Sequence, residues 1–489
     1  MFCRVKEKVG KLFDTVAPEL YATALNAVID CNMAHLLEKG VVLGFSGGAD
    51  SVFLMCFLSE YRRREGKDFP IVACHVNHMI RGEEALRDME FSRDFASELG
   101  IEFVSVNCDV PTLAKERGCG LEEAARDARY ATFEELNSKS GGSYCIALAH
   151  NASDNLETVI FNMMRGAGLN GMCGILPVRG NIVRPLIKIS KRDILQALLE
   201  ADLPYVIDST NMSVDYTRNY IRHKIVPELS HLNASPEDAV SRLTESLSVD
   251  NDYLSSLASS ALSALPEPVT ASSLAKLDIP ILSRVLMLLC KRKTGFTLES
   301  KHTKSIIKSL NLDNFSLSIG GGYSYVCQRG ICKFLSEEEQ TKNNEVYFLS
   351  AGENKIDKYS ASVKVLSDSE DILSNVYKFS IHAIIPSAII NGDLHLRFRR
   401  EGDYILLRGH KRKLKKIFND MDIPPFDRER IPLLCDDLGI VWIPGVGIRD
   451  YVKTDYVKSP KIKIVINCDK ADSNEGFFLP LSHRFNKKD

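Results

Sequence analysis

Short apolar runs alternate with amphipathic stretches between residue 41 and about residue 225. The apolar runs predict strands, because strands buried on both faces carry few polar residues. We expect these strands at Val41–Phe45, Ile71–Val76, Phe103–Val106 and Tyr144–Ala149. The stretches between them predict helices at Ser51–Arg63, Glu83–Leu99, Leu121–Ser138 and Asp154–Met164. This alternation is typical of an α/β fold, here a Rossmann-like parallel sheet with helices on both faces.

The pattern changes on both sides of this segment, and the changes predict the domain organisation. A chain of 489 residues suggests about three domains, at roughly 100–200 residues each. We expect an N-terminal helical extension (1–40), the α/β domain (41–227), a helical middle domain that binds substrate (228–312), a β-rich connecting segment (313–382), a small α+β C-terminal domain (383–468) and a tail (469–489).

Composition is that of a globular protein with no membrane span. Apolar residues make up 45% and charged residues 26% of the chain. No apolar run reaches the roughly 18 residues of a spanning helix, and the N-terminal segment lacks the apolar core of a signal peptide. The thirteen cysteines include no C-x-x-C pair, which argues against a zinc ribbon, a redox pair and a disulfide framework. We therefore expect a cytoplasmic protein.

Positive charge is concentrated near the C-terminal end, although the net charge is only −2. Nine Lys and Arg residues lie between Arg397 and Lys416, against two acids, Glu401 and Asp403, for a local charge of +7. Such a block is often a solvated face. It is equally typical of a surface that contacts a nucleic-acid backbone, and composition does not decide between the two.

The segment VVLGFSGGADSV (41–52) contains the most specific motif of the chain. Its glycines allow a tight turn, and its hydroxyls, N–H groups and following helix N-terminus form a cradle for phosphate. No lysine follows the glycines, so the loop is not of the Walker type. It resembles the pyrophosphate loop of enzymes that cleave ATP between the α- and β-phosphates. This resemblance implies that ATP is bound by Ser46, Gly47, Gly48, Ala49, Asp50 and Ser51.

Two further polar clusters follow predicted strands, where ligands of parallel sheets bind. In HVNHMIR (75–81), His75 and Asn77 can hydrogen-bond an adenine or a ribose. A loop whose polar groups are satisfied by the protein is the alternative. The third strand end carries His150, Asp154 and Glu157.

His150, Asp154 and Glu157 occupy positions i, i+4 and i+7, which share one face if the segment is helical. Carboxylates beside a phosphate loop suit Mg²⁺, with Asp50 and Asp154 as ligands, or the activation of an attacking amine. A purely structural interpretation stays open, because Asp154 as N-cap with Glu157 three residues later is a capping box.

Arginines on predicted helices and loops could clamp phosphate or RNA. Arg126 and Arg129 lie three residues apart on one helical face, although spacing alone favours pairing with nearby acids such as Glu122. Arg165 opens a Gly-rich segment (165–171) that could close over a site or be an ordinary loop.

Taken together, the motifs resemble the bacterial tRNA(Ile)-lysidine synthetases. The matching stretches are GFSGGADS, HVNHMIRGEEA, LEEAARDARYATF, AHNASDNLETVIFNMMRGAGLNGMCGI, RPLI and DSTN…TRNYIRHKIVPEL, with RFRREGDYILLRGHKRKLKKIFNDMDIPPFDRERIPLL near the end. The likeness is strong over 41–230, good over 395–450 and weaker between. The order and number of the motifs, rather than any one of them, make it specific.

This chain departs from the family's usual A-H-H-x-D-D-Q-x-E-T motif. It has Asn151, Ser153 and Asn155 where the second His, the first Asp and the Gln are usual. One carboxylate fewer puts the metal ligands in doubt, but Asp154 and Glu157 are retained.

The resemblance implies ATP-dependent ligation of free L-lysine to C2 of the wobble cytidine of tRNA(Ile) with a CAU anticodon, through an AMP-activated cytidine. It implies ATP and Mg²⁺ as cofactors and catalytic roles for Asp50, His150, Asp154 and Glu157. Arg126, Arg129 and Arg165 would steady the intermediate or the RNA. The expected tRNA contacts are Arg222, Arg399, Arg400, Lys411, Arg412, Lys413, Lys415 and Lys416. Oligomeric state stays open, a homodimer included.

Three other functions share some of these features. A tRNA 2-thiocytidine synthetase shares the loop but needs paired cysteines. A nucleotide-binding or tRNA-binding module without turnover is kept open by Ser153. An amidotransferase-type ligase would need a glutaminase domain, and its motifs are missing from the sequence.

Overall fold

The computed structural model describes residues 4–79, 83–207, 217–312, 314–340, 345–356, 359–366, 374–376, 380–421, 423, 425–450 and 460–468. The chain divides into two compact units, Met1–Tyr253 and Leu254–Asp489. The finer domain boundaries expected from the sequence stay a prediction.

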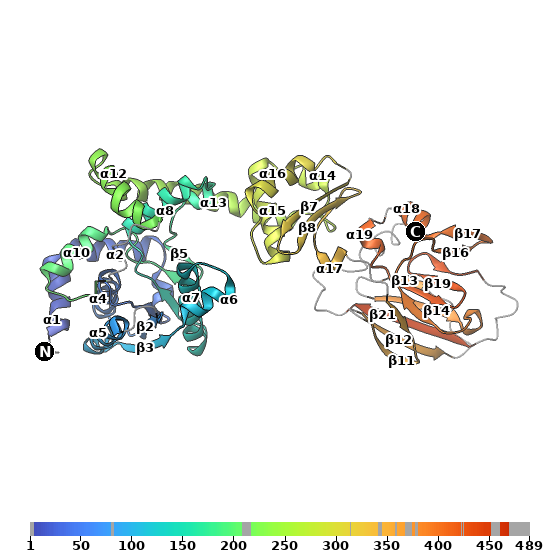
Figure 1. Ribbon diagram of the computed structural model, residues 1–489, viewed down its shortest axis with the longest axis horizontal. Helices are drawn as coiled ribbons and strands as arrows, with labels where there is room; N and C mark the ends of the chain where they lie inside the picture. Colours follow the sequence, from blue (N-terminus) through green and yellow to red (C-terminus); the bar gives the residue numbers. More distant parts are fainter. Residues whose placement is uncertain are drawn as a thin grey trace. The chain divides into compact units, whose positions relative to one another are not determined.

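The first unit, coloured blue to green in Figure 1, is built on a six-stranded sheet with the order β3-β2-β1-β4-β6-β5. Its strands are β1 (Val41–Gly44), β2 (Ile71–Asn77), β3 (Glu102–Asn107), β4 (Cys145–Ala147), β5 (Val178–Arg179) and β6 (Ile182–Val183). All neighbours pair in parallel except β5, which is antiparallel to β6. The predicted α/β class with a parallel sheet is thereby confirmed.

Helices cover both faces of this sheet at β1, whose residues are apolar on both faces. On β1, Val41 and Leu43 pack into the same core as α4 (Ala49–Arg64), whose residues 52–58 are fully buried. The side chain of Val42 points the other way and packs against Phe133 of α7 (Leu121–Lys139). Burial on two sides explains why β1 is a continuous apolar run rather than an alternating one.

The remaining elements of the first unit surround this core. They are α1 (Arg4–Lys11), η1 (Leu12–Val16), α2 (Pro18–Asp30), α3 (Ala34–Leu37), α5 (Glu83–Leu99), α6 (Val110–Arg117), α8 (Ala152–Met164), α9 (Leu169–Met172), α10 (Lys191–Glu200), α11 (Thr217–Tyr220), η3 (Ile221–Ile225) and α12 (Val226–Leu232). The N-terminal helices are integral to the unit, since Leu12, Phe13 and Val28 are fully buried in the core that contains α4. The long helix α13 (Pro236–Ala264) begins in this unit and continues into the next.

The second unit contains two hydrophobic cores. In the first, helices α14 (Ala271–Leu274), α15 (Ile279–Thr294) and α16 (Ser300–Ser309) pack on an antiparallel sheet of β7 (Asn314–Gly320), β8 (Tyr323–Gln328) and β9 (Ile331–Ser336). The second core lies among two five-stranded sheets. Their strands are β10 (Val346–Phe348), β15 (His395–Arg397), β18 (Leu433–Asp436), β19 (Gly439–Ile443) and β20 (Gly447–Ile448), then β11 (Gly352–Ile356), β12 (Tyr359–Leu366), β21 (Lys461–Cys468), β14 (Ser380–Pro386) and β13 (Ser374–Val376).

A two-stranded hairpin adds to this second core. It consists of β16 (Tyr404–Leu407) and β17 (His410–Lys413), followed by α18 (Leu414–Asp420). Further short helices of this unit are α17 (Glu337–Gln340), η4 (Ser387–Ile389) and α19 (Pro425–Arg428). Among the helices whose residues are described, none is long and apolar enough to span a bilayer.

Candidate active site

The loop between β1 and α4 is a tight turn whose shape requires a glycine at position 47. Gly47 has φ +81°, in the left-handed region, and a Cβ there would lie 2.9 Å from Ser92 Oγ. The carbonyl of Gly47 accepts a hydrogen bond from the Val206 N–H at 2.9 Å. A side chain at this position would therefore be strained by its backbone angle and crowded by α5.

Hydroxyl groups and the start of α4 line this loop. Ser51 Oγ donates to the Gly48 carbonyl at 2.8 Å and lies 3.3 Å from Ser46 Oγ. No side chain caps α4 at Gly48. The first N–H groups of the helix therefore remain available to an anion, together with the positive end of the helix dipole.

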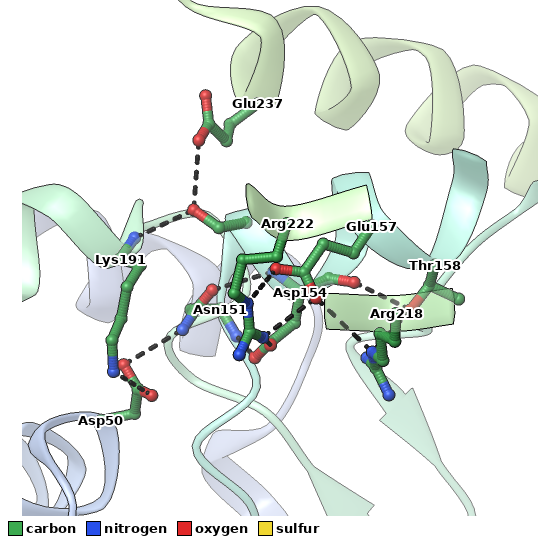
Figure 2. Close-up of polar contacts among 10 residues, drawn as sticks. Asp50, Asn151, Asp154, Glu157, Thr158, Lys191, Arg218, Arg222 and Glu237 are labelled. Atoms are coloured by element: carbon green, nitrogen blue, oxygen red, sulfur yellow. Dashed lines mark hydrogen bonds and ion pairs between the residues drawn. The ribbon is translucent and has the colours of Figure 1, made fainter. Parts of the chain in front are cut away.

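Asp50, in the first turn of α4, is held by two side chains from elsewhere in the chain. Its Oδ2 lies 2.6 Å from Lys191 Nζ, and its Oδ1 accepts from Asn151 Nδ2 at 3.1 Å (Figure 2). Burial, the largest cause, raises the pKa of Asp50, and the negative charge of Asp154 adds to this. Lys191 and Asn151 act in the opposite direction.

Asn151, rather than Asp154, is the N-cap of α8. Asn151 Oδ1 accepts from the Asp154 N–H at 3.0 Å, and Asp154 Oδ2 accepts from the Asn151 N–H at 3.2 Å. The capping box predicted for Asp154 with Glu157 was therefore wrong by one turn, because the helix begins at Ala152. A shared helical face of His150, Asp154 and Glu157 had been expected. His150 instead precedes the helix and therefore does not lie on the same helical face as the two acids.

Two arginines hold the acids of α8. Glu157 is buried and forms a bidentate ion pair with Arg222, at 2.6 Å from Nε to Oε1 and 2.9 Å from Nη2 to Oε2. Arg222 Nη2 also lies 3.4 Å from Asp154 Oδ1. Arg218 contributes a weaker ion pair to Glu157 at 3.5 Å and donates to Thr158 Oγ1 at 3.3 Å (Figure 2). The expected RNA ligand Arg222 thus lies in the acid cluster.

Arg184, which follows β6, fixes the state of His150, which follows the neighbouring strand β4. Arg184 is 4% exposed; its Nε donates to His150 Nδ1 at 3.2 Å and its Nη1 donates to the Leu176 carbonyl at 2.7 Å. A guanidinium offers only donors, so His150 Nδ1 accepts through its lone pair and the ring proton lies on Nε2. Burial and nearby positive charges lower the pKa of His150 to about 4, against the effect of Asp154.

The arginines expected to clamp phosphate differ in their surroundings. Arg126 lies over the Tyr130 ring at 5.2 Å, and Arg165 lies over the Phe161 ring at the same distance. Burial lowers the pKa of Arg129, and the positive charge of Arg126 adds to this effect. Arg126 also lowers the pKa of His150. Arg126 and Arg129 therefore belong to the electrostatic surroundings of the site.

His75 and Asn77 lie near the end of β2 and are largely buried, at 6% and 8% exposure. His75 Nδ1 lies 3.1 Å from the carbonyl of Phe45, which can only accept, so Nδ1 carries the proton in this contact. Asn77 Oδ1 accepts from the Met79 N–H at 3.0 Å. Arg81 and the segment 208–216 lie outside the described residues.

Sequence reasoning assigned no role to Lys191 or Glu237, which the structure links through Ser153. Ser153 Oγ accepts from the Lys191 N–H at 3.1 Å and lies 3.1 Å from Glu237 Oε1 on α13. Asn155 Oδ1 likewise accepts from the Ile175 N–H at 2.7 Å. No local pattern announces these contacts, because the partners are 20 to 84 residues apart.

In the second unit the basic block divides into paired and exposed cations. Arg397 is buried in a bidentate ion pair with Asp403, at 2.8 and 2.9 Å. Arg399 pairs with Glu429 and Arg412 with Asp420. The exposed remainder includes Arg400, Lys411, Lys413, Lys415 and Lys416. Lys411 Nζ lies 3.5 Å from the centre of the Tyr404 ring across the hairpin.

The chain is similar to known proteins over most of its length. Residues 22–229 match the PP-loop domain family, and residues 394–463 match the TilS substrate C-terminal domain family. The tRNA(Ile)-lysidine synthase of Clostridium acetobutylicum is 33% identical over 437 residues, which are 85% of this chain and 92% of that protein. Those of Parabacteroides distasonis (33%, covering 88% and 95%) and Thermotoga maritima (30%, covering 86% and 95%) are similarly related. The chain belongs to the tRNA(Ile)-lysidine synthase family.

Proposed function

We propose that this protein ligates free L-lysine to C2 of the wobble cytidine in the CAU anticodon of tRNA(Ile), with ATP as the activating substrate. Membership of the family over most of the chain supports this function. One observation carries it to particular residues: Asn151 joins the phosphate loop to the acids of α8. Its side-chain Nδ2 donates to Asp50 at 3.1 Å. Its backbone N–H donates to the Asp154 carboxylate, and its side-chain Oδ1 accepts from the Asp154 N–H. Phosphates and an attacking amine would therefore lie side by side.

The reaction needs ATP because the cytosine O2 is a poor leaving group. Attack of this oxygen on the α-phosphate forms an AMP ester and releases pyrophosphate. The ε-amine of lysine then attacks C2, and AMP departs with the oxygen. Residues 46–51 would bind the phosphates through the hydroxyls of Ser46 and Ser51 and the N–H groups at the start of α4. His75 and Asn77 would line the nucleotide site.

Mg²⁺ belongs to this proposal as the companion of ATP. Magnesium commonly binds one or two carboxylates together with phosphate oxygens and waters, and it neutralises charge that develops on the phosphates. Asp50 and Asp154 fit this role, because both carboxylates accept a hydrogen bond from Asn151, at 3.1 and 3.2 Å, and therefore lie near each other. Among the described residues no cluster of three or more ligating side chains exists, so the phosphates would complete the shell.

Asp154 is better placed than Glu157 to take the proton of the lysine amine. Both oxygens of Glu157 are engaged by Arg222 in short hydrogen bonds. Asp154 Oδ1 lies at a longer distance, 3.4 Å, from Arg222. We therefore assign contact with the amine to Asp154, and to Glu157 the positioning of Arg222. His150, Arg126 and Arg129 would face the reacting phosphate or the RNA.

The exposed cations of the second unit would bind tRNA through its phosphates. Lys411, Lys413, Lys415 and Lys416 are exposed on or directly after the β17 strand. Contacts of this kind position an RNA and make its affinity salt-dependent. The paired arginines Arg399 and Arg412 would contribute less, because each already holds a carboxylate.

The proposal is tested by pyrophosphate release from ATP with purified protein, Mg²⁺, lysine and CAU-anticodon tRNA(Ile), each omitted in turn. We expect release to require ATP and the tRNA, and labelled lysine to appear in the RNA. Tight nucleotide binding without release or lysine transfer would contradict the proposal and favour a binding module. Cytoplasmic location and a homodimer stay predictions.

A further inference from the structure

Lys191 places a positive charge directly on the carboxylate of the phosphate loop. Its Nζ lies 2.6 Å from Asp50 Oδ2, across a sequence separation of 141 residues (Figure 2). Lys191 is the first residue of α10, and its backbone N–H donates to Ser153 Oγ at 3.1 Å. The backbone is thus fixed, while the side chain, 39% exposed, reaches the site along a flexible stem.

The Lys191 ammonium lies against the Asp50 oxygen that a divalent cation would bind. The second oxygen of Asp50 is taken by Asn151. A divalent cation bound to the same carboxylate oxygen would repel the ammonium strongly at this distance. Binding of Mg²⁺ to Asp50 therefore requires that the ammonium leave it.

A second acceptor for the ammonium would be present as soon as a nucleotide binds. Asp50 is the second residue of α4, and the uncapped N–H groups of that helix begin at the same turn. One helical turn rises about 5.4 Å, so phosphate oxygens in the cradle would lie within one turn of Asp50. A lysine ammonium is a compact point charge with three rotatable donors, which suits such an exchange of partners.

We propose that Lys191 is a nucleotide-binding residue. In the empty site it neutralises Asp50, and when metal and nucleotide bind it moves to the β- and γ-phosphates, which later leave as pyrophosphate. The inference rests on the proposed function for the identity of the nucleotide as ATP. It assigns opposite effects to one side chain. Lys191 opposes a metal ion that arrives alone, and it favours pyrophosphate.

Binding to the full-length protein tests this directly, without tRNA or lysine. Titration calorimetry would measure sodium pyrophosphate without metal, and electron paramagnetic resonance would measure Mn²⁺ without nucleotide. The variants are Lys191→Met and Lys191→Arg, with Lys188→Met as the matched control. Lys188 pairs with Glu245 on α13 at 3.1 Å and with Asp30 on α2 at 3.6 Å. Thermal unfolding of each variant would confirm that it folds.

We expect Lys191→Met to weaken pyrophosphate binding about tenfold, as the loss of one charge-assisted contact predicts. The same variant should bind Mn²⁺ several-fold more tightly, because Asp50 and Asp154 lose their neutralising charge. Lys191→Arg should restore pyrophosphate binding, and Lys188→Met should change neither affinity.

Three results would overturn the inference. Unchanged affinities for both ions would mean that Lys191 contacts neither. Weaker binding of both ions in a folded Lys191→Met variant would mean that the residue only holds the loop in shape. Tighter Mn²⁺ with unchanged pyrophosphate would leave Lys191 as a counter-ion and reject the transfer. Failure of the proposed function appears elsewhere, as a lack of pyrophosphate release by the wild-type protein with all substrates.

Discussion

Removing His150 should change how the stability of the first unit depends on pH. Burial is the largest cause that lowers the pKa of His150 to about 4, from an ordinary value of 6.5, and the positive charges of Arg184, Arg218 and Arg126 lower it further. Asp154 opposes the shift. Protonation would place an N–H on Nδ1, directly against the Arg184 N–H that now donates to it.

The two pKa values determine how the free energy of unfolding changes with pH. The unfolded chain binds the proton more tightly than the folded protein does, so folding is favoured most when the histidine is neutral in both states. The contribution is therefore complete above pH 6.5 and is lost as the pH falls from 6.5 towards 4. Linkage predicts that the free energy of unfolding falls by about 2 kcal/mol between pH 7 and pH 5, and by about 3 kcal/mol between pH 7 and pH 4.

Urea unfolding at pH 7 and pH 5 would measure this loss for the wild type and for His150→Gln. The chain has one tryptophan, Trp442, which lies in the second unit. A transition seen by far-ultraviolet circular dichroism but not by Trp442 fluorescence therefore belongs to the first unit. His231→Gln is the matched control, since this histidine is exposed on α12 of the same unit.

Wild type and His231→Gln should lose about 2 kcal/mol more than His150→Gln between the two pH values. Arg184→Met should also reduce the pH dependence, because it removes the donor that keeps Nδ1 unprotonated. Equal losses in wild type and His150→Gln would refute the argument that His150 is held neutral.

Three further predictions concern the loop, the acid cluster and the hairpin. Gly47→Ala should weaken ATP binding at least tenfold in calorimetry, because φ +81° and the 2.9 Å approach to α5 both oppose a Cβ. Arg222→Met should lower the free energy of unfolding by about 3 kcal/mol in urea, because it strips the main partner from the buried Glu157. Lys411→Gln with Lys413→Gln should weaken tRNA binding and reduce the slope of log affinity against log salt by about 2 in a filter assay.

Each prediction has a control that makes the same substitution elsewhere. Gly180→Ala has a similar strain, φ +61°, but nothing within 4 Å of the added Cβ, so its ATP affinity should stay unchanged. Arg117→Met breaks an exposed pair with Asp127 and should cost less than about 1 kcal/mol. Lys139→Gln should leave the salt slope unchanged. Where variant and control behave alike, the corresponding prediction fails.

The parallel sheet and the phosphate loop could be predicted from the sequence because short-range features determine them. Val41–Leu43 are apolar on both faces because helices cover both, and this produces a continuous apolar run. Gly47 needs a left-handed backbone at a fixed place between strand and helix. Neither inference requires knowledge of a distant residue.

The partners of the acids could not be predicted, because they depend on contacts between distant segments. Arg222 lies 65 residues from Glu157 and was expected to bind RNA, yet it is oriented by that buried carboxylate. The cap of α8 was misplaced for a subtler reason. Asn and Asp are both good N-caps, and which of them lies at the helix start depends on where the backbone turns. Here the turn follows His150, and Asn151 takes the position.

Ser153, which replaces the usual aspartate of the motif, has a hydrogen-bond partner in Glu237. Ser153 Oγ accepts from Lys191 and has one hydrogen left, which it can donate to Glu237 at 3.1 Å. An aspartate would restore the usual residue of the motif, but it has no hydrogen to donate and would place two carboxylates in contact. Ser153→Asp should therefore reduce pyrophosphate release rather than improve it, and Ser153→Asp with Glu237→Gln should recover most of the loss, since an amide can donate to the new carboxylate. Higher activity in the single variant would show that the missing carboxylate, rather than the link from α8 to α13, limits this site.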